Sequence, residues 1–387
     1  MIDAAAPVSL ADQPAHLRIT GLVPRDEVTV TSEMTDQHGT AWIAHAVFRA
    51  DGHGTVTLDT TAPLSGSYRG VDGMGLFWSM NPPHSDPDHV LFALAPVISK
   101  PSVDVRISVS SHGRRLATRT LTREWIGAGV TARPLTLAAD KVLGELFLPA
   151  AGTARHPAVL LFGGSEGGNS QQRTAALLAS HGYPALSVGY FGMPGLPPTL
   201  QGIPLEYFTA AAHLLAAQPQ ADPAHLIVYS GSRGSEAALL LAQDYPNLIH
   251  GAVVSAPSAQ VNPGLVGDAW SIGGKPIADN GTAIALTHVS GPVLAVTGAD
   301  DRLWPSPGWT RQIDQELTAS HDPHPHQALI YPDAGHWAAD VPYFPEGTHT
   351  VATDGHTEDL GGTRAGDAAA QEAYWPHVLA FLAALDH

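Results

Sequence analysis

The first third of the chain alternates apolar and polar residues with a period of two. Successive side chains of a strand point to opposite faces of its sheet, so this alternation predicts strands with one buried face. Turn residues such as Asp51-Gly52 and His112-Gly113 separate the alternating stretches. Short strands at this spacing, with no helical pattern between them, predict a β-sandwich over residues 1–125. The alternating stretches are residues 17–20, 27–31, 42–48, 54–58 and 103–109.

From residue 126 to residue 387 the pattern changes to continuous apolar runs separated by helical stretches. Strands that are apolar on both faces are typical of a parallel sheet covered by helices on each side. We therefore predict an α/β fold with a doubly wound, mostly parallel sheet, closed by an amphipathic helix over residues 368–385. The apolar runs are residues 158–162, 185–188, 226–229, 251–255, 293–297 and 328–331.

One of these runs leads into a helix through a short turn at Ser232. A strand, one sharp turn and a helix form the nucleophile elbow of serine hydrolases, whose usual sequence is G-x-S-x-G. The turn crowds the backbone, and the positions two before and two after the serine are the small residues Ser230 and Gly234. Ser230 stands where glycine is usual. A glycine- and serine-rich loop without chemistry would show the same pattern, so the turn alone leaves both interpretations open.

Two later strands end in residues that suit a catalytic triad. The strand over 293–297 is followed by Asp300 and Asp301, and the strand over 328–331 is followed by His336. A serine nucleophile needs a base, and the base needs an acid that orients it. The order Ser, Asp, His along the chain is that of α/β-hydrolases. We predict His336 as the base and Asp301, at the tip of its loop, as the acid, with Asp300 as the alternative.

The backbone around Ser232 offers N–H groups for a developing oxyanion. One donor is expected from Arg233, at the start of the helix that follows the turn. The second is expected from the loop 163–168, where glycines let the backbone approach a substrate closely. Gly164 and Ser165 are equal candidates there. A phosphate-binding loop is the alternative, but the stretch lacks both the G-x-G-x-x-G spacing and a following G-K-[ST].

Composition narrows the range of partners. The chain has 387 residues, of which 44% are hydrophobic and 14% charged, as expected of a well-packed protein. Its net charge of −17 and the lack of a basic cluster argue against nucleic acid or an anionic membrane as a partner. A chain start without a signal-sequence pattern, and the lack of a run of membrane-spanning length, predict a cytoplasmic protein. Without cysteine, disulfides, thiolate metal sites and a cysteine nucleophile are excluded.

The predicted triad needs neither a metal nor an organic cofactor, and we expect none. His321, His324 and His326 form a short histidine- and proline-rich loop that suggests a metal site at first sight. Their spacing matches no single face of a helix or strand, so a solvated loop is the preferred interpretation. The oligomeric state is not predictable from the sequence.

Several short motifs in both halves resemble the acyl-CoA thioesterase / bile-acid-CoA:amino-acid N-acyltransferase family. These motifs are residues 18–24, 66–71, 74–80, 203–208, 231–236, 298–301 and 331–336. The resemblance implies an immunoglobulin-like sandwich followed by an α/β-hydrolase domain, with a triad of Ser232, His336 and Asp301. Hydrolases of this family mostly carry serine as the nucleophile, whereas its amino-acid acyltransferases carry cysteine. Ser232 therefore favours hydrolysis.

The resemblance makes coenzyme A thioesters the first expectation for the substrate. The negative net charge does not favour a nucleotide with several phosphates, although Arg173, Arg233 and Arg302 could provide local contacts. A carboxylic-ester or lactone hydrolase, or an acyltransferase of a biosynthetic pathway, is the alternative. A binding protein without activity on a hydrolase scaffold is a third interpretation, which an intact triad disfavours.

The apolar motif Met74–Met80 would form a conspicuous patch if it were exposed. We therefore expect it to pack within the sandwich and against the second domain, near the mouth of the active site. The alternative is that it only fills the core of the sandwich.

Overall fold

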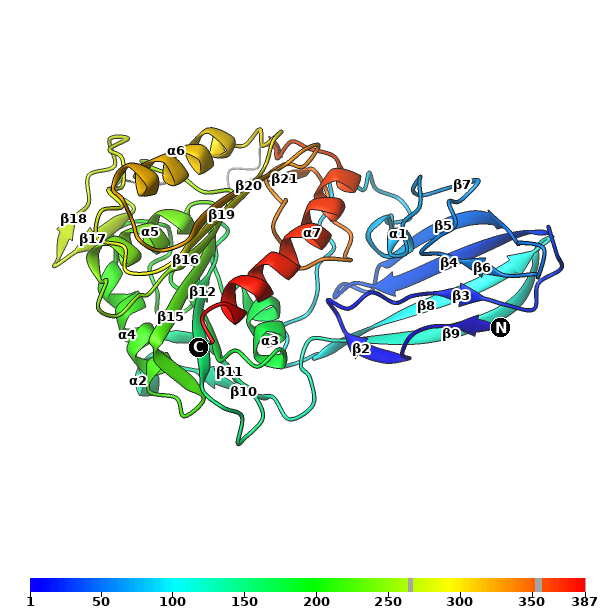
Figure 1. The fold of residues 1–387 in the computed structure, drawn as a ribbon, viewed down its shortest axis with the longest axis horizontal. Helices are drawn as coiled ribbons and strands as arrows, with labels where there is room; N and C mark the ends of the chain where they lie inside the picture. The colour runs from blue at the N-terminus through cyan, green and yellow to red at the C-terminus, as the bar shows by residue number, and fades with distance from the viewer. Residues whose placement is uncertain (264–266, 352–356, 387) are drawn as a thin grey trace.

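The structure, a computed structural model, describes residues 1–263, 267–351 and 357–386. Two parts lie side by side in Figure 1, a β-rich N-terminal part and a larger part in which helices surround a sheet. We propose the boundary between the two domains at residues 125 and 126, because β9 ends at Glu124 and β10 begins at Thr131. None of the helices in the described residues has the length and apolar character needed to cross a bilayer.

The N-terminal part consists of a six-stranded sheet with the order β2-β9-β8-β4-β5-β7 and a three-stranded sheet with the order β1-β3-β6. Burial alternates along the long strands, as the period-two pattern predicts. Trp42 and Phe48 of β5 are fully buried on the inner face. The elements are β1 (Ile2–Asp3), β2 (Val8–Leu10), β3 (Arg18–Ile19), β4 (Glu27–Thr35), β5 (Ala41–Arg49), β6 (Val56–Thr57), β7 (Ser65–Gly66), α1 (Gly75–Trp78), β8 (Ser102–Ser111) and β9 (Arg114–Glu124).

The second part has the predicted α/β-hydrolase architecture. Its eight-stranded sheet has the order β10-β11-β13-β12-β15-β16-β19-β20, and the six strands from β13 to β20 are parallel. The sheet strands are β10 (Thr131–Leu135), β11 (Leu143–Leu148), β12 (His156–Phe162), β13 (Ala185–Gly189), β15 (Ala221–Gly231), β16 (Ala252–Ser255), β19 (Val293–Gly298) and β20 (His326–Tyr331). The helices are α2 (Leu137–Asp140), α3 (Gln172–Ser180), α4 (Leu205–Ala216), α5 (Gly234–Asp244), α6 (Ser306–Ala319) and α7 (Arg364–Ala383). Short strands outside the main sheet are β14 (Ile203–Pro204), β17 (Trp270–Ile272), β18 (Lys275–Pro276), β21 (His349–Val351) and β22 (Thr357–Asp359).

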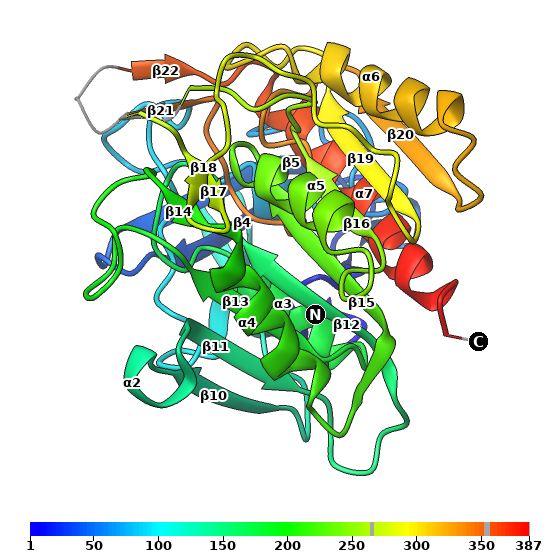
Figure 2. The same ribbon diagram turned by 90° about the vertical axis from the view of Figure 1, so that its left-hand side faces the viewer.

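Helices cover both faces of this sheet, which is why its central strands are apolar on both sides (Figure 2). Helices α4, α5 and α6 pack on one face, together with Phe162 and Trp270. Helices α3 and α7 pack on the other face, which turns toward the N-terminal part (Figure 1). One continuous apolar core joins that face to the interior of the N-terminal sheets.

The motif Met74–Met80 contains α1 and lies where the two parts meet. Met74, Leu76, Phe77 and Met80 are buried in the shared core. Arg364, the first residue of α7, donates hydrogen bonds to the carbonyl oxygens of Trp78 at 3.2 Å and Met80 at 2.6 Å. The prediction that this motif packs within the β domain and against the second domain is confirmed. Its place near the mouth of the active site stays a prediction.

Candidate active site

Ser232 lies in the turn between β15 and α5 with a backbone φ of 51°. This left-handed conformation is rare for a residue with a side chain and is the strained geometry of a nucleophile elbow. The Ser232 N–H donates to the Ser255 carbonyl oxygen at 2.9 Å, which ties the turn to the end of β16. A Cβ atom on Gly234 would lie 2.1 Å from the Gly163 carbonyl oxygen, so only glycine fits there.

Ser230, which replaces the usual glycine of the elbow, is accommodated by a hydrogen bond. Its hydroxyl donates to the Phe162 carbonyl oxygen at 2.8 Å, at the end of β12. The side chain is fully buried. Because the polar group finds a partner in the neighbouring strand, this departure from the usual sequence leaves the turn intact.

Asp301 and His336 are in direct contact. Asp301 Oδ2 lies 2.9 Å from His336 Nδ1, and 0% and 4% of the two side chains are exposed. The other carboxylate oxygen, Oδ1, accepts the backbone N–H groups of Leu303 at 3.0 Å and Trp304 at 3.3 Å. A carboxylate held in this way fixes the Nδ1–H tautomer of the imidazole and leaves Nε2 able to accept a proton.

Ser306 is a site residue that sequence reasoning missed. Its hydroxyl donates to Asp301 Oδ2, the same oxygen that contacts His336, and lies 2.6 Å from the Thr297 hydroxyl. The residue is fully buried at the start of α6. A hydroxyl residue five positions after the predicted acid, at a helix start, is the only sequence signal that would have pointed to it.

Asp300, the alternative acid, is engaged elsewhere. Its carboxylate accepts hydrogen bonds from Arg302 Nε at 3.2 Å and Nη2 at 2.9 Å, and 45% of the side chain is exposed. The Gly362 N–H also donates to Asp300 Oδ2, at 3.2 Å. This geometry favours Asp301 as the partner of His336.

The elbow and the Asp301–His336 pair lie at the same edge of the sheet, because each follows a parallel strand. Trp304 connects the loop after β19 to the end of β16, the strand beside the elbow strand: its indole Nε1–H donates to the Ala256 carbonyl oxygen at 3.0 Å, and its ring centroid lies 6.2 Å from that of His336. In the described residues the Ser232 hydroxyl forms no hydrogen bond with His336. Such catalytic hydrogen bonds are often long without substrate and shorten when substrate binds.

Two of the three candidate oxyanion donors have free N–H groups. Within the residues that the structure describes, the backbone N–H groups of Arg233 and Ser165 have no hydrogen-bond acceptor. The Gly164 N–H, in contrast, donates to both carboxylate oxygens of Glu166, at 3.1 Å to Oε1 and 2.9 Å to Oε2. Gly164 nevertheless lies against the nucleophile, since a Cβ on Gly164 would be 2.9 Å from Ser232 Cβ.

A buried acidic cluster lies behind His336. Asp367 of α7 accepts the Gly335 N–H at 2.7 Å, and burial raises the pKa of this carboxyl to about 7. Burial also raises the pKa of Asp340, and burial together with the nearby charges of Asp340 and Asp367 raises the pKa of Glu346 well above its usual range. Gln371 donates to Glu346 Oε2 at 2.7 Å and to the Trp337 carbonyl oxygen at 2.9 Å. The cluster therefore supports the loop that carries His336.

The three arginines suggested as phosphate ligands all have partners within the protein. Arg233 pairs with the fully buried Glu236 at 3.3 Å, and only 11% of its side chain is exposed. Arg302 binds Asp300 and Asp359 at 2.9 and 3.2 Å. Arg173 is half-buried, stacks on Trp125 and faces the acidic cluster. These internal partners disfavour Arg173 and Arg233 as ligands of substrate phosphates, and a contact from Arg302, whose side chain is 55% exposed, stays a prediction.

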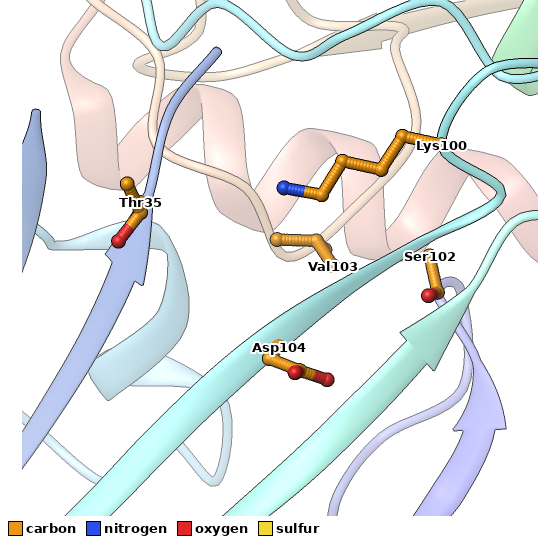
Figure 3. A pocket seen from close by; sticks show the side chains of 5 residues that line it. All are labelled: Thr35, Lys100, Ser102, Val103 and Asp104. Atoms are coloured by element: carbon orange, nitrogen blue, oxygen red, sulfur yellow. The ribbon is translucent and has the colours of Figure 1, made fainter. Parts of the chain in front are cut away.

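The surface has two hollows away from the predicted site. One is a hollow of about 270 Å³ in the N-terminal part, lined by Thr35, Lys100, Ser102, Val103 and Asp104, into which the Lys100 ammonium points (Figure 3). The second, of about the same volume, is lined by residues 154–156, Asp222, Leu385 and Asp386. Neither contains a predicted site residue.

The histidine loop shows no metal-binding arrangement in the described residues. His326 Nε2 lies 2.9 Å from the Thr318 hydroxyl and 3.9 Å from Asp314. His324 uses its backbone N–H to bind Asp322, at 3.1 Å. His326 is the first residue of β20 and only 19% of its side chain is exposed, so it belongs to the sheet, and the solvated-loop interpretation is wrong for this residue.

Sequence comparison with known families finds two matches. Residues 12–137 match the acyl-CoA thioester hydrolase/BAAT N-terminal region, and residues 274–385 match the BAAT/acyl-CoA thioester hydrolase C-terminal region. Ser232 lies in the stretch between them.

Curated relatives are similar over nearly the whole chain. Acyl-coenzyme A thioesterase 6 of Mus musculus is 29% identical over 402 residues, covering 96% of this chain and 93% of the relative. Peroxisomal succinyl-coenzyme A thioesterase of Mus musculus is 29% identical over 367 residues, covering 86% and 84%. Mitochondrial acyl-coenzyme A thioesterase 2 of Rattus norvegicus is 27% identical over 402 residues, covering 96% and 86%.

Among solved structures, a putative dienelactone hydrolase from Klebsiella pneumoniae matches with a TM-score of 0.46 and 18% identity, covering 66% of this chain and 98% of that one. A puromycin-hydrolysing peptidase from Mycobacterium tuberculosis matches with a TM-score of 0.47 and 16% identity, covering 90% of this chain and 52% of that one.

Proposed function

Because this chain belongs to the acyl-CoA thioester hydrolase/BAAT family, we propose that it is a serine hydrolase that cleaves acyl thioesters. The observation that carries the proposal is the buried hydrogen bond between Asp301 and His336, beside an elbow that holds Ser232 at a positive φ. The relatives named as acyl-coenzyme A thioesterases support the thioester as the substrate class.

In the proposed reaction, Ser232 Oγ attacks the acyl carbonyl carbon while His336 Nε2 takes the hydroxyl proton. Asp301 holds the imidazole and stabilises its positive charge. The oxyanion is stabilised by the Arg233 N–H and by an N–H of the loop after β12. The C–S bond then breaks, His336 returns the proton to the leaving thiolate, and an acyl-serine ester remains.

The second half of the reaction repeats these steps with water. The water oxygen attacks the acyl-serine carbonyl carbon while His336 takes a proton from the water. His336 then protonates Ser232 Oγ as the ester bond breaks. The product is a carboxylic acid. A serine ester is less disposed than a cysteine thioester to attack by an amine, so Ser232 favours water over an amino acid as the acceptor.

A carboxylic-ester or lactone hydrolase is a second candidate, favoured by one observation. Arg233 and Arg302 pair with carboxylates, Arg173 stacks on Trp125, and the net charge is −17, so the site offers little attraction to a leaving group with several phosphates.

Three octanoyl substrates separate the candidates. Octanoyl-CoA carries the nucleotide, octanoyl-N-acetylcysteamine is a thioester without phosphates, and p-nitrophenyl octanoate is a simple ester. We expect kcat/KM to be higher for both thioesters than for the ester, and added glycine or taurine to leave octanoate as the product. A clear preference for the ester would favour the second candidate, and an N-octanoyl amino acid product would indicate an acyltransferase.

A further inference from the structure

Glu166 holds the backbone of the loop after β12 with its own carboxylate. Both carboxylate oxygens accept the Gly164 N–H, at 3.1 and 2.9 Å, and Ser170 Oγ donates to Oε1 at 2.6 Å. The Glu166 side chain itself is exposed. The solvent-exposed Glu166 carboxylate thus binds the Gly164 N–H. This N–H belongs to the same loop as Ser165, the other candidate oxyanion donor.

This carboxylate lies beside the nucleophile. The position of a Cβ on Gly164 would be 2.9 Å from Ser232 Cβ and 3.1 Å from Glu166 Oε2. Ser232 Cβ and Glu166 Oε2 are therefore no more than about 6 Å apart, the sum of these two distances. The loop that carries the Gly164 N–H is the one proposed above to donate to the acyl oxygen, so that oxygen and the Glu166 carboxylate would share the space beside Ser232.

We infer that Glu166 is a gating residue whose carboxylate occupies part of the oxyanion site in the resting enzyme and must leave when an acyl group binds. Two anions only a few ångströms apart repel each other, and solvent at the exposed Glu166 screens part of this repulsion. The oxyanion of the intermediate and the carboxylate of the product are both negative, as is the Glu166 carboxylate, so each is repelled by it. Because Glu166 is exposed, its side chain can move into solvent.

As a consequence, anionic ligands should bind less tightly than neutral ones in the space where the acyl carbonyl group would lie. The carboxylate product of hydrolysis competes with a carboxylate that is tethered to the same loop, and a tethered group acts at a high effective concentration. Glu166 would thereby weaken inhibition by the product while neutral substrates displace it at a lower cost. This inference rests on the proposed function, because it assigns the acyl carbonyl to the space beside Ser232.

The test compares charged and neutral inhibitors of p-nitrophenyl octanoate hydrolysis. Octanoate is the product anion, octanamide is its neutral analogue, and phenylboronic acid forms a tetrahedral anion on a reactive serine. For Glu166→Gln we expect inhibition by octanoate and by phenylboronic acid to become at least five-fold tighter, with octanamide unchanged. Ser170→Ala, which loosens the carboxylate, should shift both anions in the same direction by less.

Glu206→Gln is the matched control, because Glu206 is also an exposed glutamate that accepts a glycine N–H, that of Gly273 at 2.7 Å. Its inhibition constants should equal those of the wild type. Unchanged or weaker inhibition of Glu166→Gln by the two anions would overturn the inference, and so would an equal shift for octanamide. Failure of a fluorophosphonate to label Ser232 in the wild type would instead overturn the proposed function.

Discussion

The Ser306 hydroxyl donates to Asp301 Oδ2, the carboxylate oxygen that also faces His336 Nδ1. Asp301 therefore has a complete set of donors: a hydroxyl and an imidazole N–H on one oxygen and two backbone N–H groups on the other. A carboxylate held on both oxygens cannot rotate away from the imidazole without losing several hydrogen bonds. Ser306 is thus a positioning residue for the proposed triad.

Replacing Ser306 with alanine should lower kcat by about ten-fold while leaving KM nearly unchanged, since one charge-assisted hydrogen bond contributes roughly 1.5–3 kcal/mol. Steady-state kinetics with p-nitrophenyl octanoate measure this. Ser306→Thr retains the hydroxyl and should recover much of the activity. Equal losses in the alanine and threonine variants would mean that packing at the start of α6 matters rather than the hydrogen bond.

The two neighbouring aspartates should differ sharply in their effect. Asp301→Asn should reduce kcat by about 10³-fold or more, because an asparagine amide favours the wrong imidazole tautomer. Asp300→Asn should reduce it by less than about three-fold, since that carboxylate binds the exposed Arg302 and the Gly362 N–H, neither of which belongs to the proposed triad. The paired measurement decides the assignment, and the reverse ranking would give the role of the acid to Asp300.

Asp367 should make the folded protein less stable as the pH rises from about 4 to about 7. Burial raises its pKa from 3.8 to about 7, so across this range the folded state retains a proton that the unfolded state has lost. Stability contributed by the protonated form is fully present below pH 4 and is lost as the pH passes 7. Asp367→Asn keeps an acceptor for the Gly335 N–H and carries no charge.

The melting temperature of Asp367→Asn should therefore depend less on pH than that of the wild type, with the largest gain at pH 8. Differential scanning calorimetry from pH 4 to pH 8 measures this change. Asp340 and Glu346 keep their own titration in this variant, so the dependence should be reduced and not abolished. Parallel curves for the two proteins would contradict the raised pKa of Asp367.

Arg364 should be a major contact between the two parts of the chain. It donates to the carbonyl oxygens of Trp78 and Met80 and to Asn81 Oδ1 at 2.7 Å. Arg364→Ala would leave these acceptors without a partner, at a cost of about 1–3 kcal/mol each where water cannot reach them. We expect a lower melting temperature for this variant.

A fragment that begins at Gly127 lacks the N-terminal part altogether, and we expect it to be poorly soluble. A soluble fragment with an unchanged melting point and unchanged kcat/KM would show that the N-terminal part is only tethered.

The period-two pattern was sufficient to find β4, β5 and β8 but not β9 (Arg114–Glu124). Its inward-facing positions include Arg119 and the buried Arg123 on either side of Leu121, so no apolar alternation marks the strand. The antiparallel strand β10 at the edge of the main sheet was missed because an exposed edge strand needs few apolar residues.

The order of Ser232, Asp301 and His336 was predictable because each follows an apolar strand, and parallel strands bring their carboxyl ends to one edge of a sheet. Ser306 and Glu166 were not predictable, because their roles depend on how two loops fold back on themselves. The partners of the three arginines were not predictable for the same reason. The sequence shows a positive charge but not the buried Glu236 that already pairs with Arg233.

The central claim is that Ser232 is the nucleophile, and the most direct measurement is mass spectrometry of the protein after reaction with a fluorophosphonate. The account predicts one added phosphonyl group, on the peptide that contains Ser232, together with loss of hydrolysis of p-nitrophenyl octanoate. In Ser232→Ala the label should be absent, and kcat should be lower by several orders of magnitude in a protein that still unfolds cooperatively. Labelling of a different residue, or a Ser232→Ala variant that keeps about a tenth of the wild-type activity, would contradict it.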